Sequence, residues 1–340
     1  MKPGLAFACA AALASFVATQ ARAEDCPGGL RKINIGVAVS PPNVVHTAPY
    51  IAKGLGFFAK RCIDANILQF EGGASAAALA AVSQGTAISA ITEAAIAQGV
   101  KAKQIWVMAP RAPHDYFVAA EIKTAADLKG KRLSAAGGVG AFNWLMGRAM
   151  LKTAGLTVDD AKFISQGTAG RLPGLLTGQL DGVVLHPEDV FLAQQKKPGT
   201  HSLASIAELL PDLVFNAYGA SDGFIAQNRD LLRDTIAAMI EANRAIYRER
   251  AKVLPIIMEA TQKPQDAVEY ALDTMTKRCT WAVNTGFDAA RSAWSMQFAI
   301  DNGDVDAGRR LGFAALADVK LAQDAVAAAG GPTEINNCKD

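Results

Sequence analysis

The sequence predicts an α/β protein of two lobes, each a mostly parallel sheet flanked by helices, with a helical C-terminal tail on the first lobe. Three observations predict this class. From Ile33 onward, apolar strand-like runs alternate with helical segments, as in right-handed βαβ units. A second unit with the same alternation begins near Thr124. From about Asn228 the chain is helical, with no further alternation.

The first lobe begins with the apolar run at 33–39, which reads as a buried strand. Further strands are predicted at 66–70, 87–91 and 104–109, and helices at 47–60, up to Gln84, and at 92–99. Thr47 is suited to cap the helix that follows it. The pattern therefore predicts a sheet built from strands that are separated by helices.

The second lobe is predicted around a glycine loop at 137–140, which joins a strand at 131–135 to an amphipathic helix at 141–153. Such a loop places free N–H groups and the positive end of the helix dipole at one spot, which favours an anion. A tight turn that needs a positive φ explains the same glycines without a ligand. The remaining elements are expected at 125–128, 162–165, from Arg171 onward, and at 182–185.

The chain is expected to cross between the lobes twice, near 110–118 and 214–221, so that two strands form a hinge. We therefore predict a first lobe of residues 24–115 plus 216–340 and a second lobe of residues 116–215. The tail helices are expected at 228–250, 264–277, 287–301 and 313–329, and the first lobe is the core that they would cover.

The N-terminal segment has the three parts of a secretory signal peptide. Lys2 precedes an apolar run from Leu5 to Val17, and the small-residue motif Ala21-Arg22-Ala23 follows. The run is too short to span a membrane. We expect cleavage after Ala23 and a soluble protein in the periplasm.

Charge excludes some classes of partner. Without Lys2 and Arg22, the basic residues equal the 32 acidic ones in number. A near-neutral chain gives no sign of a nucleic-acid or anionic-membrane surface. We expect a monomer without a cofactor or metal.

Four cysteines follow the signal segment, and an even number in an oxidising compartment suggests two disulfides with three alternative pairings. Cys26 and Cys62 each precede a predicted strand, and parallel neighbours would bring them to the same sheet edge. We therefore favour Cys26 with Cys62 and Cys279 with Cys338. The wide scatter of the four argues against a metal site.

Three segments carry a resemblance to a known family. They are Tyr50-Ile51-Ala52-Lys53-Gly54-Leu55-Gly56-Phe57-Phe58, Ile122 to Arg132 (IKTAADLKGKR), and Leu176 to Gly182 (LTGQLDG). In this order they resemble periplasmic solute-binding proteins of ABC importers, in the group that binds sulfonates, taurine, nitrate and thiamine pyrimidine precursors. The resemblance covers residues 33 to about 250 and implies the type II periplasmic binding protein fold. Thr86 stands where the family usually has an aspartate, and the cysteine cluster of the catalytic branch has no counterpart here.

Ligands of open parallel sheets bind at the carboxyl ends of the strands, so the loops there and the hinge should line a cleft. The ligand-binding residues that we expect are Ser40, Asn43, His46, Gly73, Ser75, Thr92, His114, Gly138, Phe142, Asn143, Trp144, Thr168, Arg171, His186 and Tyr218.

Several of these residues have a plainer interpretation. Ser75 and Thr168 would suit a sulfonate or carboxylate oxygen, but helix capping gives the same geometry. Arg171 is suited to a bidentate pair with an anion, or to a solvated helix start. Phe142 and Trp144 suit either core packing or stacking on a planar ligand.

No catalytic motif is apparent. Glu93 and Glu188 read as helix-start glutamates, and loop histidines more often form surface hydrogen bonds than act as bases. The resemblance thus implies a protein that captures a small organic anion and delivers it to a membrane permease. An enzyme on the same fold, similar to a thiamine pyrimidine precursor synthase or a dehydratase, and an exported ligand sensor are the alternatives.

Overall fold

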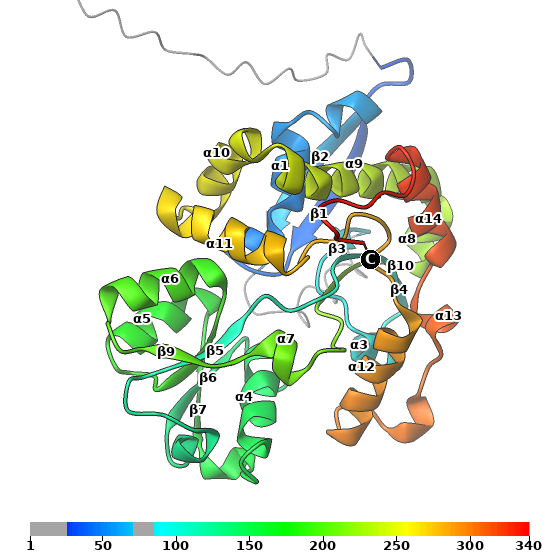
Figure 1. The fold of residues 1–340 in the computed structure, drawn as a ribbon. Coiled ribbons are helices and arrows are strands. Elements are labelled where there is room, and N and C mark those ends of the chain that lie inside the picture. Colours follow the sequence, from blue (N-terminus) through cyan, green and yellow to red (C-terminus); the bar gives the residue numbers. More distant parts are fainter. Residues whose placement is uncertain (1–25, 71–84, 340) are drawn as a thin grey trace, which may run out of the picture.

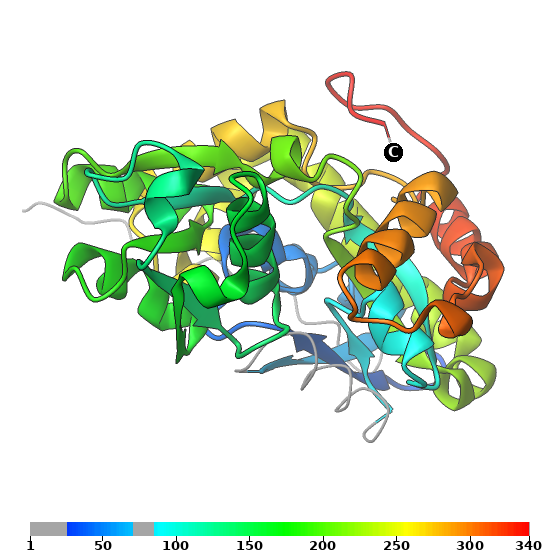
Figure 2. The ribbon, with the colours of Figure 1, turned by 90° about the horizontal axis from the view of Figure 1, so that it is seen from below.

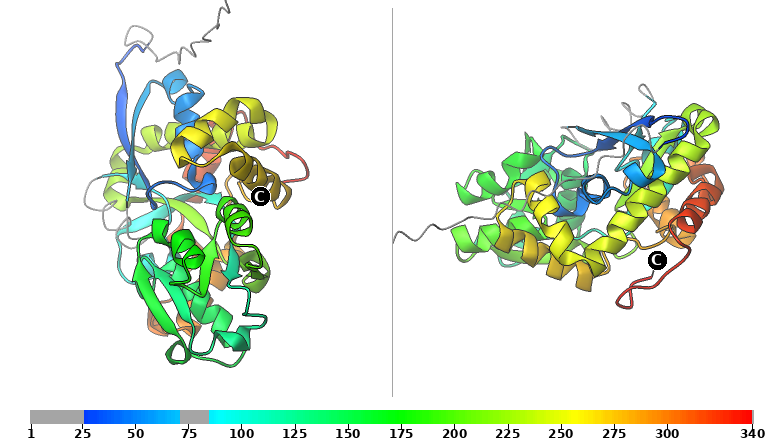
Figure 3. Two further views of the ribbon diagram at one scale, coloured as in Figure 1. Left: turned by 90° about the vertical axis from the view of Figure 1, so that its left-hand side faces the viewer. Right: turned by 90° about the horizontal axis from the view of Figure 1, so that it is seen from above.

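Two five-stranded sheets organise the chain, and the computed structural model describes residues 26–70 and 85–339 (Figure 1). The first sheet has the order β2-β1-β3-β10-β4 and the second has the order β7-β6-β8-β5-β9. We call the parts built on them the first lobe and the second lobe. Figure 3 shows one lobe above the other, with the second lobe in green.

The strands are β1 (Arg31–Val37), β2 (Ile63–Gln69), β3 (Ala87–Ile88), β4 (Ala102–Ala109), β5 (Asp115–Val118), β6 (Arg132–Ala136), β7 (Lys162–Gln166), β8 (Gly182–Leu185), β9 (His201–Ser205) and β10 (Asn216–Ser221). The α-helices are α1 (Ala48–Gly54), α3 (Glu93–Ala97), α4 (Phe142–Lys152), α5 (Arg171–Leu176), α6 (Pro187–Lys196), α7 (Ile206–Leu209), α8 (Asp222–Gln227), α9 (Arg229–Arg248), α10 (Arg250–Thr261), α11 (Gln265–Lys277), α12 (Ala289–Asp301), α13 (Phe313–Leu316) and α14 (Val319–Ala328). Short 3-10 helices are η2 (Val44–His46), η3 (Ala59–Arg61), η4 (Ala125–Leu128), η5 (Val158–Asp160), η6 (Thr168–Gly170) and η7 (Ala307–Arg309).

The predicted two-sheet α/β architecture is confirmed, and both sheets are mixed. In the first sheet β1 pairs in parallel with β2 and β3, whereas β10 is antiparallel to β3 and β4. The second sheet repeats this, because β6 is parallel to β7 and β8, and β5 is antiparallel to β8 and β9. The antiparallel strands are those at which the chain enters or returns to a sheet.

Most of the tail packs on the first lobe, as expected, although α11 also contacts α6 of the second lobe, and Trp294 and Phe298 of α12 pack against the second lobe's core. In α9, Leu232, Ile236, Met239 and Ile240 are buried, which is the spacing of one apolar helix face. This face contacts α1, α10 and α14, and Trp281 completes the core. Figure 2 shows this lobe beside the green second lobe, seen from below.

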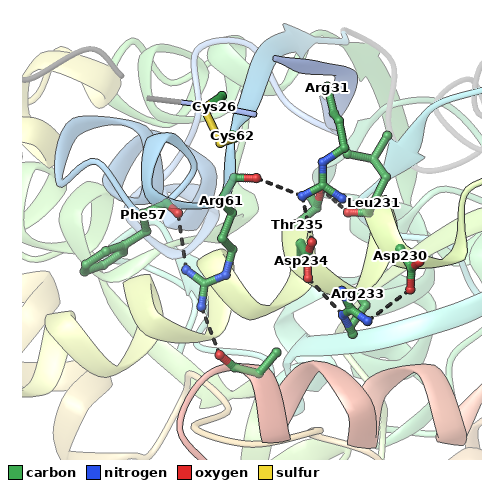
Figure 4. A network of polar contacts seen from close by, with 11 residues as sticks. Cys26, Arg31, Phe57, Arg61, Cys62, Asp230, Leu231, Arg233, Asp234 and Thr235 are labelled. Carbon is green, nitrogen blue, oxygen red and sulfur yellow. Dashed lines mark hydrogen bonds and ion pairs between the residues drawn. A yellow bond between two sulfur atoms is a disulfide. The ribbon is translucent and has the colours of Figure 1, made fainter. Parts of the chain in front are cut away.

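Both predicted disulfides form, between Cys26 and Cys62 and between Cys279 and Cys338. The reason given for the first is also confirmed, since β1 and β2 are parallel neighbours with Arg31 opposite Ile63. Beside this disulfide, Arg31 donates to the carbonyl of Arg61 at 2.8 Å and pairs with Asp234 of α9 at 2.7 Å (Figure 4). Arg61 pairs with Glu241 of the same helix at 2.6 Å, so ion pairs to α9 reinforce the disulfide.

Several elements differ from those predicted. The helix expected to reach Lys60 ends at Gly54, and the tail helix expected at 313–329 is broken at Ala317. Part of the expected hinge is strand β5, and four helices, α6, α7, α8 and α10, were not predicted. The helix expected to end at Gln84 lies outside the described residues. No helix in the described ranges is long and apolar enough to span a bilayer.

Candidate functional site

Eight side chains gather where the two lobes meet, and we call them the interlobe cluster. The first lobe contributes Asn43 and His46, the second contributes Phe142, Arg171, His186 and Glu188, and the two crossings contribute His114 and Phe215. The polar members are all 6% exposed or less. Ionisable groups are seldom so deeply buried unless they are paired or have a function.

Local sequence places these residues at the ends of strands. Asn43 precedes η2, in the loop after β1, and His46 ends η2. His186 is the N-cap of α6 directly after β8, and Pro187 begins that helix, as is common at a first helical position. Phe142 begins α4, after the glycine loop, in which Gly137, Gly138 and Gly140 all have positive φ.

Arg171 is the cationic centre of the cluster. Its Nε donates to the carbonyl of Thr168 and its Nη1 donates to the carbonyl of Val184, both at 2.9 Å. Its Nη2 reaches Asn43 Oδ1 at 3.5 Å, across the lobe boundary. Within the described residues, no carboxylate lies within ion-pair distance of this guanidinium, although burial opposes its charge and lowers its pKa.

His186 lies against Arg171, with Nδ1 at 3.4 Å from Arg171 Nη2. An arginine only donates, so Nδ1 must accept. Burial, helped by His114 and Arg171, holds the pKa of His186 well below its usual range, and the ring is therefore neutral. The proton of this neutral ring is then on Nε2, which is buried and has no hydrogen-bond partner in the part of the chain described.

Aromatic rings form the apolar part of the interlobe cluster. The His114 ring centroid is 4.0 Å from that of His186 and 4.9 Å from those of Phe142 and Phe215. His46 is 5.7 Å from His186 and 6.1 Å from Phe215. Burial, followed by the charge of Arg171, lowers the pKa of His46 to about 3 and that of His114 well below its usual value. All three rings are uncharged at neutral pH.

Glu188 is the anionic centre. Its Oε1 accepts from Asn43 Nδ2 at 3.0 Å and from the Val44 backbone N–H at 3.1 Å, both in the first lobe. Its Oε2 is buried and unpartnered among the described residues. Burial, and then the neighbouring Asp189, raise the pKa of Glu188. Asp189 itself forms an ion pair with Lys263 of the first lobe.

His186, Glu188 and Asp189 bring three ligand-type atoms within 4.8 Å of one another, a grouping that suits a divalent cation in number and type. The surroundings are unfavourable for one. The Arg171 guanidinium lies against the ring of His186, and Lys263 already neutralises Asp189. The donor set therefore fits an organic ligand better than a cation.

The first comparison is with protein families. The model described as "NMT1/THI5 like" matches residues 43–250, which is more than half of the chain.

The chain belongs to the NMT1/THI5-like family.

The matched range contains every residue of the interlobe cluster, so both the anionic and the cationic centre lie inside the family region. The resemblance seen in the sequence is thus confirmed. No curated protein sequence matches the chain.

Solved structures show the same fold. The alkanesulfonate-binding protein SsuA of Xanthomonas axonopodis pv. citri, bound to MOPS, matches with a TM-score of 0.68 and 16% identity, over 85% of this chain and 98% of that one. The nitrate-binding protein NrtA of Synechocystis PCC 6803 matches with a TM-score of 0.68 and 13% identity, over 88% of this chain and 89% of that one. This NMT1/THI5-like chain therefore has the fold of the substrate-binding proteins of ABC importers.

An enzyme shares the fold as well. The desulfurization enzyme DszB matches with a TM-score of 0.60 and 15% identity, over 87% of this chain and 99% of that one. The fold therefore does not by itself separate binding from catalysis.

The structure brings six of the predicted ligand-binding residues of this family member into the cluster, namely Asn43, His46, His114, Phe142, Arg171 and His186, whereas Asn143 donates to the Ala136 carbonyl at 3.4 Å. Thr168 contributes its carbonyl to Arg171, and Gly138 lies in the turn before α4. Gly73 and Ser75 lie outside the described residues.

Four predicted residues have other contacts. Ser40 donates to Gln69 Oε1 at 3.0 Å, and Thr92 caps α3 by accepting from Ala95. Trp144 lies 4.7 Å under the guanidinium of Arg148, and Tyr218 is buried in the core of the first lobe beside Trp106. Two surface pockets, one beside Gln323 and one beside Lys32, share no residue with the cluster.

Sequence reasoning missed two members of the cluster. Glu188 was assigned to helix stabilisation, whereas its side chain turns back to Asn43 and Val44 of the other lobe. Phe215 was passed over because it lies in an apolar run that leads into β10. Position in the sequence could have identified Glu188, since Glu188 and His186 both follow the end of β8.

Proposed function

We propose that this protein is the extracytoplasmic substrate-binding component of an ABC importer and that it captures a small organic anion between its lobes. One observation carries the proposal, namely the buried guanidinium of Arg171 without a carboxylate partner in the described residues. A buried charge without a direct ion pair is unfavourable, and an anionic oxygen from a ligand would pair with it. The fold shared with sulfonate- and nitrate-binding proteins supports the same conclusion.

The surroundings of Arg171 suit an organic acid. Thr168, Val184, Asn43 and His186 accept four of the five N–H groups of Arg171, which leaves one on Nη1 for an acid oxygen, and the Nε2–H of His186 is a second donor. Phe142, Phe215 and the neutral ring of His114 supply apolar surface for the rest of the ligand. Contacts from both lobes mean that a bound ligand would favour the closed arrangement, as in hinge closure of periplasmic binding proteins.

Delivery to a permease requires export. We propose that residues 1–23 act as a cleaved signal peptide and that the mature protein is a periplasmic monomer with lobes 24–115 plus 216–340 and 116–215. Two disulfides support an oxidising compartment. N-terminal sequencing of protein from a periplasmic extract should begin at Glu24, and retention of Met1 would contradict the proposal.

The test is a ligand screen combined with two arginine variants. Native mass spectrometry of freshly purified protein would detect retained ligand, and thermal-shift assays would rank sulfonates, carboxylates, nitrate and pyrimidines. We expect Arg171→Gln to weaken binding of the best anion about 100-fold, the scale of a buried charge-assisted contact. Arg229→Gln, which breaks an exposed pair with Asp318 in the first lobe, is the control and should not change the affinity. An unchanged affinity in Arg171→Gln would overturn the proposal.

An enzyme on the same fold is the second candidate. The structural likeness to DszB favours it. The two candidates differ in what happens to the ligand. A binding protein returns its ligand with unchanged mass after prolonged incubation, whereas an enzyme releases a product.

A further inference from the structure

The interlobe cluster holds three histidine rings that come from three separate parts of the chain. His46 lies in the first lobe, His114 in the first crossing and His186 in the second lobe. We propose that closure of the lobes expels protons from these rings, so that the protein closes on its ligand at neutral pH and opens to release it in acid. The release of a ligand rests on the proposed function, whereas the opening is measurable without a ligand.

The three rings pack closely in the closed arrangement. The ring centroids of His114 and His186 are 4.0 Å apart, and His46 is 5.7 Å from His186. All three residues are 5% exposed or less. Nδ1 of His46 and Nδ1 of His114 are buried and have no hydrogen-bond partner among the described residues. A charged imidazolium carries an N–H on both nitrogens, so protonation would bury an unbonded N–H together with a charge.

A permanent positive charge lies beside the rings. Arg171 Nη2 is 3.4 Å from His186 Nδ1, and a guanidinium keeps its charge at every pH in question. Burial is the largest cause of the lowered pKa of each ring, and the charge of Arg171 contributes to all three. A second cation at this buried place would add repulsion to the cost of desolvation. The closed cluster therefore holds the rings as neutral imidazoles.

Opening changes the surroundings of the rings. A rotation at the crossings would carry His46 away from His186 and let water between the lobes, and a hydrated imidazole has a pKa of about 6.5. His114 and His186 stay neighbours, because β5 pairs with β8 with Asp115 opposite Leu185. These two rings repel each other when both are charged, so the open protein should bind about two protons, one on His46 and one on the pair. Acid therefore favours the open arrangement.

Carboxylates around the cluster titrate as well. Burial raises the pKa of Glu188, so this group takes up a proton on closure and opposes the rings, one proton against two. Asp189 is paired with Lys263 of the first lobe. Asp115 lies 3.8 Å from Arg278 of the first lobe, and burial raises its pKa, so its protonation is a second way for acid to weaken a contact between the lobes. The variants below separate Asp115 from the rings.

The first experiment measures opening in the ligand-free protein. Small-angle scattering would follow the radius of gyration from pH 7.5 to pH 5.0, with circular dichroism to establish that the protein stays folded. We expect the radius to rise reversibly, with a midpoint at about pH 6, between the values for the hydrated and the buried rings. A radius that does not change over this range would overturn the inference.

Histidine variants assign the effect. The double variant His46→Gln/His114→Phe should stay closed at pH 5.0, and a phenylalanine fits at position 114 because that ring already packs against Phe142 and Phe215. His46→Gln alone should lower the midpoint, which keeps the test valid if the double variant does not fold. His201→Gln, outside the cluster on β9, is the control and should expand as the wild type does. Full acid expansion in the double variant would assign the effect to carboxylates and overturn the inference.

Ligand affinity separates this inference from the proposed function. Ethanesulfonate is the probe, because a sulfonate keeps its charge throughout this pH range. Its affinity should fall about 10-fold for each expelled proton between pH 7.5 and pH 5.5, and the fall should be smaller in the double variant. Equal affinities at the two pH values would overturn the coupling and leave capture of an anion in place. If no acid binds at either pH, the proposed function fails, and scattering still decides whether acid opens the lobes.

Discussion

Arg148 in α4 of the second lobe forms a bidentate ion pair with Asp304, which follows α12 in the first lobe. Nη2 lies 2.6 Å from Oδ2 and Nη1 lies 3.2 Å from Oδ1, and Nη1 also donates to the Asn302 carbonyl at 3.2 Å. Trp144 packs under the guanidinium. The pair is only partly exposed, so it stabilises the closed arrangement of the lobes.

Asp304→Asn should therefore shift the lobes toward an open arrangement. The loss of a partly buried bidentate pair removes roughly 1 kcal/mol of closure free energy, which corresponds to about a fivefold loss in ligand affinity. Small-angle scattering of the ligand-free variant should show a larger radius of gyration. Asp318→Asn removes a partner of Arg229 within the first lobe and is the matched control. Equal radii for Asp304→Asn and wild type would contradict the role of the pair.

Acid should destabilise the cluster through its histidines. The folded protein keeps His46 neutral down to a pKa of about 3, whereas the unfolded chain binds a proton below about 6.5. Stability from this ring is thus complete above pH 6.5 and is lost as the pH falls toward 3, by about 2 kcal/mol at pH 5. His46→Gln should flatten the decline in thermal midpoint between pH 7 and pH 5. His201→Gln, outside the cluster on β9, should leave the decline as it is.

Glu93 should make the protein less stable as the pH rises, which is opposite to the effect of His46. It is buried at the start of α3, accepts from Ser292 at 3.3 Å, and burial raises its pKa to about 7. Between pH 4.5 and 7 the unfolded chain loses this proton while the folded protein keeps it, so stability falls as the pH rises. Glu93→Gln should raise the free energy of unfolding at pH 8 by about 3 kcal/mol. Denaturant titrations at pH 5 and pH 8 measure this, and a gain of equal size at both values would refute the assignment.

Removing the first disulfide should loosen the N-terminal strand. The cross-link joins residues 36 positions apart, which corresponds to about 4 kcal/mol in the loop-entropy treatment. The double variant Cys26→Ser/Cys62→Ser should have a free energy of unfolding that is lower by up to about that amount. The ion pairs of Arg31 and Arg61 to α9 remain in this variant and reduce the loss. Urea unfolding of the double variant is the measurement. A change below about 1 kcal/mol would show that these ion pairs hold the strand without the cross-link.

Prediction of the fold from sequence succeeded where local pattern and local chemistry agreed. The glycine loop and the helix after it are within a residue of their predicted bounds, because positive-φ glycines and helix periodicity are local signals. The pairing of Cys26 with Cys62 followed from two neighbouring strands. Helix α10 was not predicted. Pro255 lies inside it and disfavours a helix interior, and packing against α1 and α9 outweighs that preference.

The interlobe cluster was predictable only in part. Arg171 and His186 were found because they follow strand ends, a positional rule of α/β sheets. The contact of Glu188 with Asn43 spans 145 residues and two lobes, and no local pattern encodes which way a helix-start glutamate turns. Tyr218 was expected at the site because it lies near a crossing between the lobes. The sequence did not reveal that its strand, β10, lies inside the first sheet, where Tyr218 is buried.

The chain leaves the first sheet after Ala109 and re-enters it at Asn216, and these two residues are opposite each other in the antiparallel pair β4–β10. In topological terms, the second lobe is a long insertion at the tip of a single hairpin. Both connections pivot at the same place, so the inserted part is able to swing as a unit while every ladder in either sheet stays intact. A rotation at that tip would carry Glu188 and Arg171 away from Asn43 together, so that one swing would open the interlobe cluster.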